Sequence, residues 1–209
     1  MELKKNYLVP VKWVSVDHFQ STFPGRLYNS NGHTDDKDIL NCGCIFVDHL
    51  SGYIHVWHQV TFSAYDNVKS KLLYGRDSAK YGVCIQVYNI DNGVFTSKYF
   101  TDELIENDQH IRFSGASSDH QNVVEKYGIQ TVIRMTCIML VHSAMRIPQG
   151  TITAELYPMA IDHAVWLYKK MPREYSGLST YELWSRSYFL PSKDIISTFH
   201  TWSSPAYVI

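Results

Sequence analysis

Two aspartates stand in or beside apolar sequence, where a carboxylate needs a partner. Asp17 lies within the alternating segment WVSVDHF, and Asp91 directly follows the mostly apolar segment VCIQVYNI. Burial of a carboxylate is costly unless its charge is compensated, and Mg²⁺ does this because it favours carboxylates together with phosphate oxygens and water. Two such ions about 4 Å apart activate an attacking hydroxyl and stabilise the leaving oxygen in phosphoryl transfer. Spacing alone leaves a simpler alternative open, that each aspartate is a turn or cap residue.

Strands and helices alternate around these residues. Hydrophobic periodicity and turn residues predict the following strands: 13–19, two strands within 42–60 joined by a turn at Ser51-Gly52, 83–90 and 110–115. The same signals predict helices at 66–82, 97–106, 123–145, 153–171 and 179–185, and a surface insertion at 23–41. The order β-β-β-α-β-α-β-α predicts an α/β domain with a mixed sheet.

Composition narrows the classes of protein. The chain has 209 residues, 45% of them hydrophobic, and a net charge of −1, so it is long enough for one well-packed domain. The near-neutral charge counts against strong autonomous DNA binding, because phosphate neutralisation supplies most non-specific affinity. We find no apolar run near 18 residues and no secretory signal, and therefore expect no membrane partner. Four scattered cysteines favour a reducing, intracellular compartment over a disulfide scaffold.

Seven stretches in order resemble the integrase catalytic core of copia-type retrotransposons. They are VSVDHFQSTFPGRL (14–27), GCIFVDHLSGYIHV (43–56), YNIDNGVFTSKYF (88–100), FSGASSDHQN (113–122), HAVWLYKKMP (163–172), GLSTYELWS (177–185) and HTWSSPAYVI (200–209). Together they cover nearly the whole chain. Single pieces such as DNG are common, but seven pieces in register are specific.

The resemblance implies an RNase H-like fold, a mixed five-stranded sheet flanked by helices. It places the core at residues 1–145 and a C-terminal helical extension at 146–209. The implied activity is DNA 3′-end processing and strand transfer into target DNA, with Asp17 and Asp91 holding two Mg²⁺ or Mn²⁺ ions. The implied partners are element-end and target DNA and further copies of the chain, in the nucleus or in a cytoplasmic virus-like particle.

The third acidic residue of the family is a glutamate on the helix that follows HQN. Here the chain reads HQNVVEKYGIQTVIR from 120 to 134, and a gap-free register places the family's glutamate on Lys126. Glu125 lies one residue earlier, which is a rotation of about 100° around a helix. We therefore take Glu125 as a displaced catalytic and metal-binding residue. Lys126 either pairs with the two aspartates, giving a poor catalyst that exchange of residues 125 and 126 improves, or faces solvent.

The polar residues before this helix resemble the family's DNA-contacting loop. By that resemblance His120, Gln121, Asn122 and Lys126 are expected to contact DNA, although Asn122 also suits a helix N-cap. We expect no zinc in the chain, because the one-residue spacing of Cys42 and Cys44 suits core packing better than a zinc site. The family's His/Cys zinc domain is likewise not expected in the dozen residues before the first strand.

Two other functions remain open. One is a catalytically inactive, integrase-derived domain that binds nucleic acid or associates with itself, and Lys126 is the residue that would separate it from an active integrase. The other is an RNase H-type nuclease that shares only the fold. We favour it less, because the matching stretches extend well beyond the metal ligands.

Overall fold

The computed structural model describes residues 13–27, 39–90, 94–113, 123–147, 154–174, 176–185 and 199–202. Its five strands are β1 (Trp13–Gly25), β2 (Leu40–Asp48), β3 (Ile54–Gln59), β4 (Val87–Ile90) and β5 (His110–Phe113). Its α-helices are α1 (Ala64–Ala79), α2 (Lys98–Glu106), α3 (Val123–Arg146), α4 (Tyr157–Lys170) and α5 (Thr180–Ser185). Short 3₁₀ helices span Val94–Thr96 and Ala154–Leu156.

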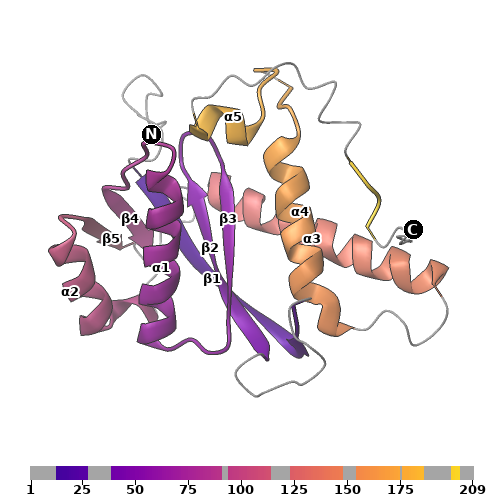
Figure 1. Cartoon of the computed structure of the whole chain (residues 1–209), viewed down its shortest axis with the longest axis horizontal. Helices are drawn as coiled ribbons and strands as arrows, with labels where there is room; N and C mark the ends of the chain where they lie inside the picture. The colour runs from indigo at the N-terminus through magenta and orange to yellow at the C-terminus, as the bar shows by residue number, and fades with distance from the viewer. Residues whose placement is uncertain are drawn as a thin grey trace.

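The strands form one mixed sheet in the order β3-β2-β1-β4-β5 (Figure 1). The β1–β2 and β2–β3 pairs are antiparallel, whereas the β1–β4 and β4–β5 pairs are parallel. Helices flank this sheet and continue into the C-terminal part of the described chain. The predicted fold class, a mixed five-stranded α/β sheet flanked by helices, is therefore confirmed.

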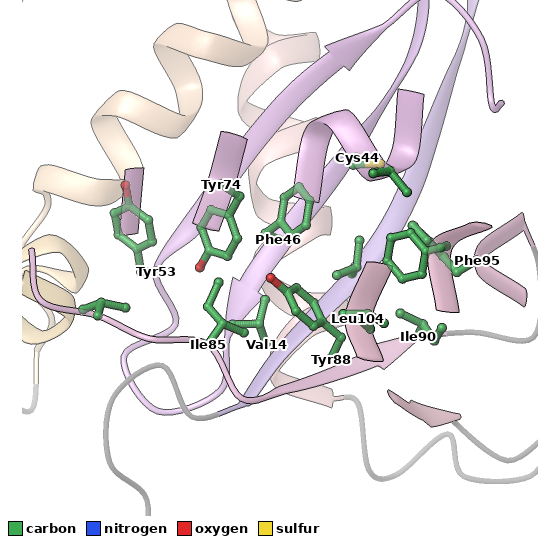
Figure 2. Close-up of a cluster of buried hydrophobic side chains, with 14 of the residues drawn as sticks. Val14, Cys44, Phe46, Tyr53, Tyr74, Ile85, Tyr88, Ile90, Phe95 and Leu104 are labelled. Atoms are coloured by element: carbon green, nitrogen blue, oxygen red, sulfur yellow. The ribbon is translucent and has the colours of Figure 1, made fainter. Parts of the chain in front are cut away.

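Each face of the sheet has its own hydrophobic cluster, because strand side chains alternate between faces. Phe46 of β2 packs with Tyr74 of α1 and Leu104 of α2 on one face, where Figure 2 shows them together. The neighbouring residue Ile45 packs on the other face with Val132 of α3 and residues of α4. The sheet is thus the middle layer between α1 and α2 on one side and α3 and α4 on the other.

The ends of α1 show how local sequence sets an element. The helix begins after Ser63, whose side chain accepts a hydrogen bond from the main-chain N–H of Asp66, as N-cap residues do. Asp66, where the sequence predicted the helix to begin, instead lies inside the first turn, and its carboxylate accepts a hydrogen bond from Thr61. Gly82, the last residue of the predicted helix, lies beyond its observed end at Ala79 and has a φ of +70°, a conformation that glycine adopts at little cost.

Helix α3 corrects one expectation from the sequence. Its stretch from Lys126 to Arg146 is long and apolar enough to cross a membrane by length and composition, although no such stretch was expected. Length and composition alone are weak evidence for a span. One side of the helix packs on the sheet, with Val132 fully buried in the second cluster.

Gly43 is the site of a first testable prediction. A Cβ built there would lie 2.5 Å from the Phe19 ring and 2.6 Å from the main-chain oxygen of Trp57. We expect Gly43→Ala to lower the free energy of unfolding by about 1–3 kcal/mol, the usual cost of overpacking. Gly75→Ala within α1 is the matched control. No atom lies within 4 Å of its added Cβ, so it should stabilise by about 0.5–1 kcal/mol. Urea unfolding measures both, and equal effects would refute the packing argument.

Candidate active site

Asp17 lies on β1, at the centre of the sheet between β2 and β4. It pairs across the strands with Ile45, and therefore lies on the face that α3 and α4 cover. Its side chain is exposed, and its Oδ1 accepts a hydrogen bond of 2.8 Å from the main-chain N–H of His18. The first predicted ligand is thus an accessible carboxylate on the α3 side of the sheet.

Asp91 lies outside the described residues, but the strand that leads to it is described. Strand β4 ends at Ile90, which pairs with Val16 of the parallel neighbour β1. Val16 and Ile90 are buried in the same cluster. The residues that immediately precede Asp17 and Asp91 therefore stand side by side on adjacent strands.

A polar group lies behind Asp17 on the same face. Ser15 is two residues before Asp17 on β1 and pairs with Asn89 of β4. The ring of His49 connects them, because its Nε2 lies 2.6 Å from Ser15 Oγ and 2.9 Å from Asn89 Nδ2. This contact ties the end of β2 to the two strands that lead to the aspartates. This group was not predicted from the sequence, although a serine and an asparagine inside otherwise apolar strands are a signal of it.

His18 contacts residues on the opposite face of the sheet from Asp17. Its ring stacks on Phe95, with centroids 4.2 Å apart and planes 10° from parallel. Its Nε2 also lies 2.9 Å from Asn67 Oδ1 of α1. Burial lowers the pKa of His18, although the hydrogen bond with Asn67 and the charge of Asp17 act in the opposite direction. His18 therefore fixes β1 to the 3₁₀ helix that comes just after Asp91, and it too was missed from the sequence.

Helix α3 carries the remaining sequence-based candidates. Residues 120–122 and the side chain of Glu125 lie outside the described residues, so their predicted roles stay predictions. Lys126 is exposed, and both alternatives for its role stay predictions. The buried positions recur along one side of the helix at Gly128, Val132 and Thr136. A Cβ on Gly128 would lie 2.9 Å from Ile54 Cδ1, so the helix comes close to the sheet there.

Cys42 and Cys44 are buried on β2, as expected for cysteines that pack in the core. Cys44 belongs to the first cluster, and Cys42 Sγ lies 3.6 Å from the main-chain oxygen of Gln59. Burial raises the pKa of the Cys42 thiol to about 11 and that of Cys44 further, which disfavours the thiolate that binds metal. Among the described residues, no group of three or more His, Cys, Asp or Glu side chains is placed to hold a metal ion.

Comparison with known proteins supports the fold. No protein-family model matches the chain, and no curated protein matches its sequence. Among solved structures, the trimeric form of the HTLV-2 integrase catalytic core domain in complex with magnesium matches with a TM-score of 0.56 and 15% identity. The match covers 84% of this chain and 97% of the viral domain.

Two further structures give the same result. The dimeric form of the HTLV-2 domain, also in complex with magnesium, matches with a TM-score of 0.57 and 15% identity over the same shares of both chains. A chain of the simian T-cell lymphotropic virus intasome in complex with the PP2A regulatory subunit B56 gamma has a TM-score of 0.61 and 15% identity. That match covers 88% of this chain and 57% of the other. The protein described here thus has the RNase H-like fold of retroviral integrase catalytic cores.

Proposed function

We propose that the chain is a copia-type retrotransposon integrase core that processes DNA 3′ ends and joins them to target DNA. The observation that carries the proposal is the pairing of Val16 with Ile90 in a sheet of integrase type. The residue after each of them is an aspartate, Asp17 or Asp91. Parallel neighbouring strands that each lead into a carboxylate can place two acidic ligands around the divalent cations that assist phosphoryl transfer.

Asp17, the one proposed ligand whose side chain the structure describes, suits a hard cation. Asp17 offers carboxylate oxygens at an accessible point of the sheet, and such oxygens are the ligands that Mg²⁺ prefers. The main-chain N–H of His18 holds one of these oxygens, and so limits the rotation of the carboxylate. When bound, Mg²⁺ or Mn²⁺ supplies the positive charge that activates a hydroxyl and stabilises the leaving oxygen. Asp17, Asp91 and Glu125 are the residues that would hold these ions.

DNA and further copies of the chain are the proposed partners. The HTLV-2 domain exists in dimeric and trimeric forms, and its relative forms an intasome. The proposed contacts to DNA are His120, Gln121, Asn122 and Lys126. With a net charge of −1, the chain provides little general attraction for phosphates, so basic segments on other subunits or domains would strengthen the binding.

The test is DNA joining by the purified chain, with a labelled duplex, a plasmid target and Mg²⁺ or Mn²⁺. We expect Asp17→Asn to lower the rate at least about a hundredfold, because a lost electrostatic stabiliser costs that much or more. Calorimetry should show weaker metal binding by the same variant. Asp102→Asn is the matched control, since Asp102 is exposed on α2, and it should leave both quantities unchanged.

Either of two results would reject this function. Joining that survives Asp17→Asn would remove this residue from the site. A wild-type chain that binds DNA yet neither binds metal nor joins DNA would favour the alternative, an integrase-derived binding or self-associating module. Lys126, at the register position of the family's glutamate, is the feature that favours this alternative.

A further inference from the structure

A cavity lies on the opposite side of the sheet from Asp17. Its volume is about 250 Å³, and its walls come from the end of α1, the start of β3, the end of α4 and α5. His55 of β3 lines it and pairs with Phe46, a residue of the first cluster. Asp17 pairs instead with Ile45 of the second cluster. The cavity is thus separate from the proposed DNA-joining site.

Two residues of the cavity wall carry buried polar atoms, the indole N–H of Trp184 and the Nε2 of His55, that have no hydrogen-bond partner among the described residues. Burial lowers the pKa of His55 to about 3, so the ring is neutral at physiological pH and brings no charge to the cavity. Neither atom has accessible surface, so neither supplies a contact to an occupant of the cavity.

Lys169 brings a positive charge to the same cavity. Its Nζ lies 4.6 Å from the centre of the Tyr53 ring, and within the described part of the chain no carboxylate forms an ion pair with it. Burial lowers the pKa of Lys169 to about 8, which reflects the cost of an ammonium group without a close counter-ion. Asp77, the acidic residue of the cavity wall, is already paired with Lys80 at 2.8 Å. Lys169 is therefore a positive charge of the cavity wall with which no described carboxylate forms an ion pair.

The walls of the cavity are aromatic. The Tyr53 and Trp184 rings stack with centroids 4.2 Å apart and planes 9° from parallel. The Tyr81 ring lies 5.0 Å from Trp184, and Tyr74 completes the lining. Flat aromatic surfaces favour a planar ligand, and a cavity of about 250 Å³ has room for little more than a single ring with its substituent.

We propose that this cavity binds a small planar carboxylate, with its oxyanion held by Lys169. The carboxylate supplies a negative charge beside Lys169 and accepts a hydrogen bond from its ammonium group. The planar body lies against the aromatic walls. This site is independent of DNA joining, and its ligand class differs from the nucleic acid and metal ions of the proposed active site.

Benzoate is the probe, and the indole N–H signal of Trp184 is the reporter in ¹H–¹⁵N NMR spectra, assigned by comparison with Trp184→Phe. We expect saturable binding with a Kd of about 1 mM or below. Benzamide, which has the same shape without the charge, should not bind measurably in this range, and this comparison needs no further variant. Inorganic phosphate should bind at least about tenfold more weakly than benzoate, because it lacks the planar body.

Lys169→Met keeps most of the side-chain length and removes the charge, so it should weaken benzoate binding at least about tenfold. Lys170→Met is the matched control, because Lys170 lies over the Tyr181 ring at 4.2 Å and does not line the cavity. It should leave the Kd unchanged. Equal binding of benzoate and benzamide, or of benzoate and phosphate, would overturn the proposal. So would unsaturable benzoate shifts, or equal losses in the two lysine variants.

Discussion

Glu125→Gln is expected to weaken metal binding at least about tenfold and DNA joining at least about a hundredfold, whereas Lys126→Gln is expected to change both little. The reason is the geometry of α3. Positions three and four residues apart share one side of a helix, and Gly128 and Val132 lie on its buried side. Position 125 is three residues before Gly128, so helix periodicity predicts that it shares this side. Lys126 is exposed.

This expectation opposes the one from the gap-free register, which places Lys126 at the ligand position. Exchange of the two residues separates them. If position 125 is the ligand position, Glu125→Lys combined with Lys126→Glu destroys metal binding. If the register is correct, the same exchange strengthens it. Calorimetric titration with Mg²⁺ and Mn²⁺ gives opposite signs for the two cases, and a circular dichroism spectrum like that of wild type confirms that α3 is retained.

Helix periodicity needs only local information, and so do the patterns that predict most of the fold. The strand pair around the Ser51-Gly52 turn and the helix at 97–106 were predicted within a few residues of the observed bounds. The predicted start of the strand at 83–90 is wrong, because long-range strand pairing sets where that strand begins. Val83 and Ile85 have the alternation of a strand and are buried, yet strand β4 begins only at Val87. It begins there because its pairing with β1 starts at Trp13 and Val87.

In the candidate site, too, residues with a local sequence signal were predicted and residues placed by long-range contacts were not. Asp17 was found because a carboxylate inside an apolar strand is unusual in its local sequence. His49, which contacts Ser15 and Asn89 from the end of β2, has no local signal. Its position depends on three strands coming together. The cavity that contains Lys169 was missed for the same reason, since its residues are distant in sequence and its lysine resembles any surface lysine of an amphipathic helix.

Glu103→Gln is expected to lower the free energy of unfolding by about 3 kcal/mol, because it leaves a buried ammonium group without its counter-ion. Lys71 of α1 is only 3% exposed, and its Nζ lies 3.3 Å from Glu103 Oε1 of α2, which is 17% exposed. Burial lowers the pKa of Lys71, and the charge of Glu103 only partly offsets this. The pair therefore connects the two helices that cover the first cluster.

The opposite substitution should behave differently. Lys71→Met removes the buried charge and keeps an apolar chain of similar length, so stability should stay within about 1 kcal/mol of wild type or rise, as when buried ion pairs are replaced by apolar residues. Glu103 still accepts a hydrogen bond of 2.7 Å from Asn107 Nδ2 in that variant. Lys80→Gln, in the exposed pair with Asp77, is the control and should cost less than about 1 kcal/mol. Urea unfolding measures the free energy of unfolding of all three variants. If Lys71→Met lowers it as much as Glu103→Gln does, the ion pair itself stabilises the fold, and the loss in Glu103→Gln is not caused by an unpaired buried charge.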